Sequence, residues 1–139
     1  MLDTDVLVAA IRSDRGASRV LLTLALERRY PALVSVPLMI EYEAVLTRPE
    51  HLDASGLSSD EMQALLDAVA LVAEPVRLSY LWRPSLPDVD DDMVLETAVN
   101  GRADMLVTFN RRDFEPLAAT FGIVVMTPIE ALRRLKKKP

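Results

Sequence analysis

Apolar residues recur along this chain in two alternating patterns. Some stretches repeat them every three to four residues, which predicts amphipathic helices, and others are short uninterrupted apolar runs, which predict buried strands. Helices are predicted at residues 6–14, 17–30, 37–48, 58–74, 91–103 and 114–121, and from residue 128 into the C-terminal tail. Short strands are predicted at residues 1–4, 32–36, 104–109 and 122–127, and near residue 76.

Strands that alternate with helices in this way predict an α/β protein whose parallel sheet is covered by helices on both faces. We expect three layers, a sheet of four or five strands, and a single domain over residues 1–139. Ligands of such sheets bind beyond the carboxyl ends of the strands. The polar residues that follow each predicted strand are therefore the candidates for chemistry.

Composition and charge narrow the function classes. Hydrophobic residues make up 50% of the chain, yet no apolar run approaches the ~20 residues of a membrane span, and no secretory signal pattern is present. The absence of cysteine excludes disulfides and thiolate metal ligands. The net charge of −5 disfavours a DNA-coating surface but is compatible with a nuclease whose acidic site is filled by cations. We expect a cytoplasmic protein with no membrane contact.

Two carboxylates stand at the end of the first predicted strand. Asp3 and Asp5 lie two residues apart, and their like charges disfavour each other's ionised form. Asp3 could cap the following helix, because an Asp side chain accepts backbone N–H bonds at that position. A cap accounts for one carboxylate only. We therefore interpret Asp3 as a metal ligand and Asp5 as its support.

Further acids follow at the starts of two later helices. Glu41 lies at the rim of an apolar helix face, although a solvated glutamate on an amphipathic helix is an equally good interpretation. Four aspartates begin the helix predicted at 91–103: Asp88, Asp90, Asp91 and Asp92. The helix dipole favours such acids by about 0.3–1 kcal/mol each, which accounts for one or two of them. Apolar residues three, four and seven positions later place Asp91 on the face toward the sheet, whereas Asp92 shares a more polar edge with Glu96.

A polar segment follows the strand predicted at 104–109. Thr108, Asn110 and Asp113 could line a site, and Arg111 and Arg112 could hold a phosphate backbone. The alternative is a turn that places Asn in a strained conformation.

The residue types present favour a hard cation. The chain has no cysteine, and its one histidine, His51, is expected at the surface of a loop, so the ligands would be oxygen atoms alone. Mg²⁺ and Mn²⁺ prefer such ligands. Such an ion neutralises crowded carboxylates and activates water for attack on a phosphodiester.

Two phosphate-handling families share the opening letters. The Asp-x-Asp start is similar to that of haloacid-dehalogenase-type phosphatases, and receiver domains also gather acids at strand ends. Both rely on a lysine after a later strand, but this chain has no lysine before Lys136. A P-loop is excluded as well, because no glycine-rich loop is followed by lysine.

Four segments, taken in order, resemble the motifs of the PIN-domain family: "LDTDVLVAA", "IEYEAVL", "DDMVLETA" and "LVTFNRRDF". Each motif alone is weak, but four in order and at familiar spacing form a specific signal over nearly the whole chain. The resemblance implies a flavodoxin-like sheet, a homodimer and Mg²⁺- or Mn²⁺-dependent ribonuclease activity. Small bacterial members are commonly VapC-like toxins that are neutralised by an antitoxin encoded alongside.

By this resemblance Asp3, Glu41 and Asp91 form the catalytic acidic triad, and Asn110 joins Asp3 and Asp91 as a metal ligand. Asp5, where the family more often has Asn or Ser, would support them together with Thr108 and Asp113. Asn110 stands where the family often has Asp, which removes one charge that Asp113 could restore. Only two residues precede Asp3, so we expect a shortened first strand or a natural start further upstream.

Three functions remain open at this point. The first is a metal-dependent endoribonuclease, the toxin of a toxin–antitoxin system, with RNA as substrate and a cognate antitoxin as partner. The second is a PIN-like interaction module with weakened catalysis, which the neutral Asn110 and the short first strand favour. The third is a phosphohydrolase acting on small phosphoesters.

Overall fold

The computed structural model describes residues 1–13, 16–79 and 89–137. Within them the helices are α1 (Thr4–Arg12), α2 (Ala17–Leu26), α3 (Val36–Leu46), α4 (Pro49–Ser55), α5 (Ser59–Val72), α6 (Val89–Asn100), α7 (Arg111–Ala119) and α8 (Pro128–Lys137). The strands are β1 (Leu33–Ser35), β2 (Glu74–Val76), β3 (Met105–Val107) and β4 (Val124–Met126). This alternation confirms the predicted α/β class.

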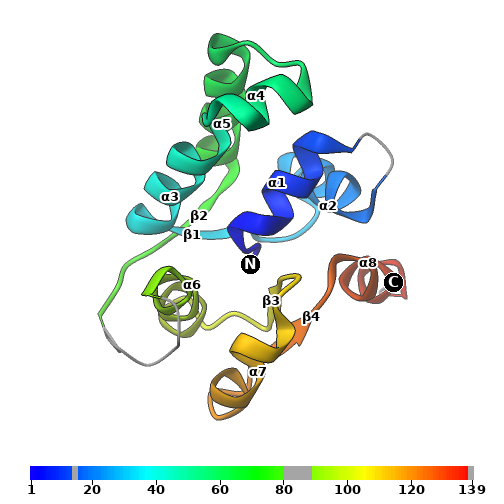
Figure 1. The fold of residues 1–139 in the computed structure, drawn as a ribbon. Coiled ribbons are helices and arrows are strands. Elements are labelled where there is room, and N and C mark those ends of the chain that lie inside the picture. Colours follow the sequence, from blue (N-terminus) through cyan, green and yellow to red (C-terminus); the bar gives the residue numbers. More distant parts are fainter. Residues whose placement is uncertain (14–15, 80–88, 138–139) are drawn as a thin grey trace.

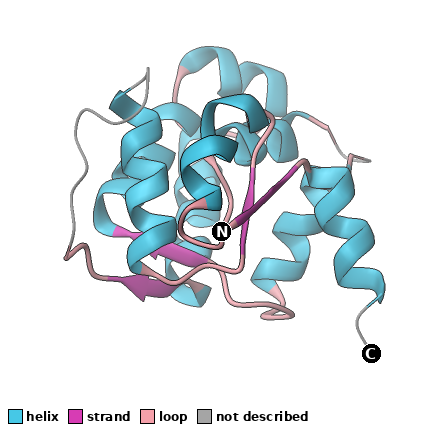
Figure 2. Ribbon diagram, turned by 90° about the horizontal axis from the view of Figure 1, so that it is seen from below, coloured by secondary structure: helices cyan, strands magenta, loops and turns pink. Residues whose placement is uncertain are grey.

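The strands form two parallel pairs rather than one continuous ladder. β1 pairs with β2 and β3 pairs with β4, and the pairs are separate in Figure 2. The N-terminal residues lie between them (Figure 1) and run alongside β3. The Asp3 amide donates to the Val107 carbonyl at 2.9 Å, and the Val107 amide donates to the Met1 carbonyl at 2.9 Å. Because α1 begins at Thr4, this segment contributes only the isolated bridge of Leu2 with Val107.

Helices pack against both strand pairs, and hydrogen bonds connect them to the N-terminal segment and to β1. α3 and α6 both contact β1 and each other, while α7 and α8 contact β4. The hydroxyl of the fully buried Tyr42 in α3 donates to the Leu2 carbonyl, which ties α3 to the N-terminal segment. The buried hydroxyls of Ser35 and Thr97 lie 2.6 Å apart and join the end of β1 to α6. These contacts join the N-terminal segment to the second half of α3 and the end of β1 to the last turn of α6.

Some local predictions were correct and others were not. The helices predicted at 58–74 and 37–48 are present as α5, which begins with a capping box of Ser58 and Glu61, and as α3, whose first turn contains Pro37. α4 was not predicted: α3 ends before Pro49, in agreement with the helix predicted at 37–48, but Pro49 then begins this further helix. His51 was predicted in a surface loop, which is wrong, because it lies in α4 and is buried. α4 packs against α1 and α3, and this tertiary contact buries the imidazole.

Candidate functional site

Asp3 lies where the N-terminal segment ends and α1 begins, and both of its carboxylate oxygens are engaged. Oδ1 accepts the Thr4 amide at 2.7 Å as the N-cap of α1, and Oδ2 accepts the Thr108 hydroxyl at 2.7 Å. The residue is only 5% exposed. The cap interpretation of Asp3 is therefore correct, and Thr108, just after β3, holds the same carboxylate from the other side.

Asp5 is held by the segment that follows β3. Its Oδ2 accepts the Phe109 amide at 3.1 Å, and its Oδ1 is buried with no hydrogen-bond partner among the described residues. The Asn110 amide donates to the Thr108 oxygen at 3.0 Å. Residues 108–110 thus wrap around the two aspartates, which fixes the start of α7 beside the start of α1.

One pocket of about 270 Å³ collects the acids. It is lined by Asp3, Thr4, Asp5, Val8, Glu41, Val45, Asp91, Val94 and Asn110. These residues come from the N-terminal segment, from α1, α3 and α6, and from the cap of α7. The predicted triad and the predicted fourth position therefore lie around the same space. We refer to this space as the acid pocket.

The charges in the acid pocket perturb one another. Burial raises the pKa of Asp3 to about 6, and the charges of Asp5 and Glu41 act in the same direction, against hydrogen bonds from Thr108 and Thr4. Burial also raises the pKa of Asp5, to which the charge of Asp91 contributes, against hydrogen bonds that include that of Phe109. Ionised carboxylates are thus disfavoured here unless a positive charge joins them.

The donor set fits a hard divalent cation in its chemistry. Four carboxylates and one amide oxygen are available, and the buried, unpartnered Asp5 Oδ1 can accept a further interaction. In the described part of the chain, no three Asp, Glu or His side chains already lie close enough to hold one ion between them.

Other predicted site residues lie outside the acid pocket. Asp113 is exposed, and its amide donates to the Asn110 carbonyl at 3.1 Å. The Arg111 guanidinium donates to Glu115 at 2.8 Å and to Glu130 of α8 at 3.0 Å. Arg112 is exposed, with no ion pair to the residues that the structure describes. Of the two arginines, Arg112 is therefore the one whose charge faces solvent without a carboxylate partner.

The polar edge predicted for Asp92 and Glu96 is wrong. Each is only 1% exposed, because α6 is covered by α3, β1 and α7 rather than along a single stripe. Asp88 lies outside the described residues, as does the side chain of Asp90. Thr4 was missed by the sequence analysis, although it lines the acid pocket. Its position between the two aspartates in "LDTDV" was the available signal.

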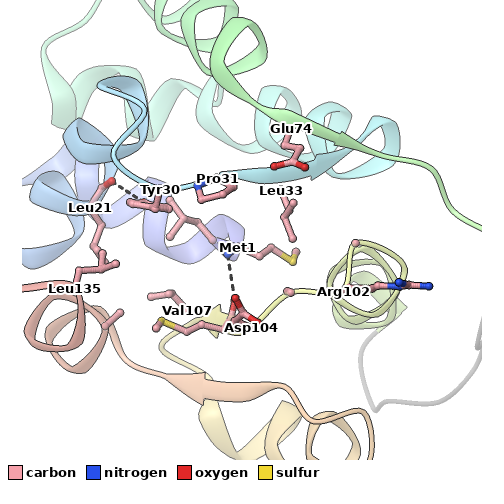
Figure 3. A pocket seen from close by; sticks show the side chains of 15 residues that line it. Met1, Leu21, Tyr30, Pro31, Leu33, Glu74, Arg102, Asp104, Val107 and Leu135 are labelled. Atoms are coloured by element: carbon pink, nitrogen blue, oxygen red, sulfur yellow. Dashed lines mark hydrogen bonds between the residues drawn. The ribbon is translucent and has the colours of Figure 1, made fainter. Parts of the chain in front are cut away.

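A second pocket of about 290 Å³ lies near the opposite ends of the strands (Figure 3). The Met1 amino group donates there to the Met105 carbonyl at 3.1 Å. Burial lowers the pKa of this amino group to about 6, against the opposing charge of Asp104. The Arg102 side chain points away from the cavity in Figure 3. The carboxylates of Glu74 and Asp104 line this second pocket and are not among the residues that line the acid pocket.

Comparison with models of known families identifies the family of this chain. The family model of the PIN domain matches residues 1–112. The chain belongs to the PIN-domain family. Proteins with a PIN domain are typically nucleases and generally use divalent metal ions. No curated protein and no solved structure matches the chain.

The PIN match includes every residue of the acid pocket and ends at Arg112. Asp113 lies beyond it, as do the partners of Arg111 in α7 and α8. No helix in the described ranges of this PIN-domain chain has the length and apolar character to cross a membrane.

Proposed function

We propose that this PIN-domain protein is a metal-dependent endoribonuclease. The observation that carries the proposal is the acid pocket, which gathers carboxylates from the N-terminal segment, α1, α3 and α6. Carboxylates with perturbed pKa values that gather in one pocket are typical of functional sites, and a bound cation would offset their mutual repulsion.

Asp3, Asp91 and Asn110 would hold Mg²⁺ or Mn²⁺, with Glu41 as the third catalytic acid. When bound, the ion neutralises the carboxylates and lowers the pKa of water in the pocket. Thr108 fixes the orientation of Asp3 and also lies within 3.4 Å of Asp5. The exposed Arg112 suits contact with the phosphate backbone of RNA.

The proposed reaction is hydrolysis of a phosphodiester. The oxygen of a water molecule forms a bond to phosphorus, and the ester P–O bond breaks with its electron pair remaining on the leaving ribose oxygen. That oxygen takes up a proton from solvent, and the attacking water gives up one proton to a pocket carboxylate. Glu41 lines the pocket and suits this acceptor role.

Cleavage of a structured RNA tests the proposal. We expect Mn²⁺-dependent cleavage that chelation abolishes and that Asp3→Asn or Asp91→Asn lowers by at least about a hundredfold. Asp53→Asn removes one carboxylate from the exposed face of α4 and serves as the charge-matched control. Cleavage that persists in chelator, or that is equal in all variants, would refute the assignment.

The biological role proposed is that of a VapC-like toxin in a type II toxin–antitoxin system. The protein would act in the cytoplasm as a homodimer and would be neutralised by a small antitoxin. This rests on the resemblance of the motifs and on the compact acid pocket. Expression alone should arrest growth, and co-expression of the protein encoded by the adjacent reading frame should relieve the arrest.

A PIN-like interaction module with weakened catalysis is the second candidate. It is favoured by the lack of three acids already at ligating distance in the described ranges. It is also favoured by the outer face of α3, where Val36 is 73% exposed and Ile40 is 64% exposed. Calorimetry that detects no Mn²⁺ binding at millimolar concentration, together with a stable protein complex, would support this candidate over the enzyme.

A further inference from the structure

Two polar atoms at the acid pocket lack a hydrogen-bond partner, and they belong to consecutive residues. Thr4 Oγ1 and Asp5 Oδ1 are both buried, and no described group donates to or accepts from either atom. Both residues line the pocket. Buried polar atoms in folded proteins are nearly always paired, so each such exception calls for a partner that arrives from elsewhere.

The neighbouring polar atoms of Asp3, Asp5 and Thr108 do have hydrogen-bond partners. Both oxygens of Asp3 are engaged, and the other oxygen of Asp5 accepts the Phe109 amide. The Thr108 hydroxyl donates to Asp3 and accepts from the Asn110 amide. The fold therefore satisfies this corner of the pocket except at the two atoms of Thr4 and Asp5. The missing partner is consequently expected in the pocket itself.

The chemistry of the two atoms restricts that partner. An ionised Asp5 Oδ1 only accepts hydrogen bonds, whereas the Thr4 hydroxyl both donates and accepts. A phosphate oxygen offers no hydrogen to Asp5 and carries a like charge. A water molecule donates to both atoms, and ordered waters commonly occupy polar cavities of this kind.

We propose that Thr4 and Asp5 together hold one ordered water molecule in the acid pocket, with Thr4 as a positioning residue. The role of this water in hydrolysis rests on the proposed nuclease function, since phosphodiester hydrolysis requires a water held against phosphorus. Thr4 then acts on the reaction through the water and does not itself touch the reacting bond.

Two substitutions at Thr4 separate its hydroxyl from its shape. Thr4→Val removes the hydroxyl at nearly constant volume, and Thr4→Ser keeps it. We expect Thr4→Val to lower kcat for RNA cleavage by about tenfold or more with little change in KM, and Thr4→Ser to stay within about threefold of the parent. The Tm of the metal-free Thr4→Val protein should stay close to that of the parent, because the Thr4 hydroxyl makes no hydrogen bond to another described group of the protein.

Thr97→Val is the matched control for stability. Thr97 is buried, as is Thr4, but its hydroxyl lies 2.6 Å from the Ser35 hydroxyl and donates to the Met93 carbonyl at 3.0 Å. Its replacement should lower Tm and leave kcat per folded molecule unchanged. A Tm for Thr4→Val that falls as far as that of Thr97→Val would assign Thr4 a structural role and overturn the inference.

Crystal structures of the parent and of Thr4→Val give a readout that does not depend on activity. The parent should contain an ordered water within about 2.7–3.2 Å of both Thr4 Oγ1 and Asp5 Oδ1, and the variant should lack it. Absence of this water from the parent, or unchanged cleavage by Thr4→Val, overturns the inference. If the water is present but the parent cleaves no RNA, the proposed nuclease function fails while the water site is supported.

Discussion

The Thr108 hydroxyl donates a 2.7 Å hydrogen bond to Asp3 Oδ2 across 105 residues of sequence. Both residues are buried, and the bond joins the end of β3 to the cap of α1. Thr108→Val leaves a buried carboxylate oxygen unpaired, so we expect a loss of about 1–3 kcal/mol in the free energy of unfolding. Urea denaturation at neutral pH, with Thr108→Ser as the control that keeps the hydroxyl, measures this loss. Equal stability of Thr108→Val and the parent would show that the bond is dispensable.

Because the pKa of Asp3 is raised in the folded protein, this group makes the metal-free protein more stable in mild acid than at neutral pH. The folded pKa of Asp3 is about 6 and the ordinary pKa of an aspartate is 3.8, so the folded chain binds the proton more tightly than the unfolded chain. The stabilisation from protonation is present below the unfolded pKa and is lost as pH rises through about 6. It amounts to at most about 3 kcal/mol.

Asp3→Asn isolates this contribution from the other titrating groups. Without divalent cations, the variant should be more stable than the parent near pH 7.5, and its advantage should shrink as pH falls toward about 4. Urea denaturation of both proteins across this range measures the difference. A constant difference at every pH would mean that the Asp3 carboxylate titrates normally.

Gly101 permits the close approach of α6 to the β1–β2 pair. A Cβ at this position would lie 2.8 Å from Val76 Cγ2, 3.0 Å from the Thr97 carbonyl and 3.1 Å from Leu33 Cδ1. We expect Gly101→Ala to destabilise the protein by about 1–3 kcal/mol through overpacking. Gly16→Ala meets nothing closer than 3.4 Å and should cost only a few tenths of a kcal/mol. Equal thermal shifts for the two variants would contradict this account.

The two arginines after Asn110 should differ in RNA binding. Arg111 is engaged by Glu115 and Glu130, whereas Arg112 is exposed without an ion pair in the described ranges. Arg112→Ala should weaken RNA binding and lower the slope of log K against log salt concentration by about one. Arg111→Ala should change the slope less. Fluorescence anisotropy with a non-cleavable RNA measures both, and a larger effect at Arg111 would reverse the assignment.

Two physical rules, together with the resemblance to the PIN-domain motifs, identified residues of the pocket from the sequence. Residues after parallel strands meet at one edge, which brought Asp3 and Asn110 together, and helical spacing oriented Asp91. The same spacing misplaced Asp92 and Glu96, since periodicity identifies one apolar face and α6 is covered on several sides.

Other contacts between distant segments were beyond prediction from one sequence, because they depend on how particular helices pack. The pairing of Arg111 with Glu130 depends on where the first turn of α8 lies relative to the first turn of α7. The burial of His51 depends on the packing of α4, a helix of seven residues that is too short to show a clear apolar period. The division of the strands into two pairs depends on where α1 begins, which the apolar pattern alone did not determine.

Titration of Mn²⁺ into the metal-free protein, followed by calorimetry near pH 7.5, tests the central claim that the acid pocket binds a divalent cation. The account predicts saturable binding to the parent that Asp3→Asn and Asp91→Asn each weaken by about tenfold or more, while Asp53→Asn leaves it unchanged. An absence of binding up to about 10 mM Mn²⁺, or the same affinity in all four proteins, would contradict it.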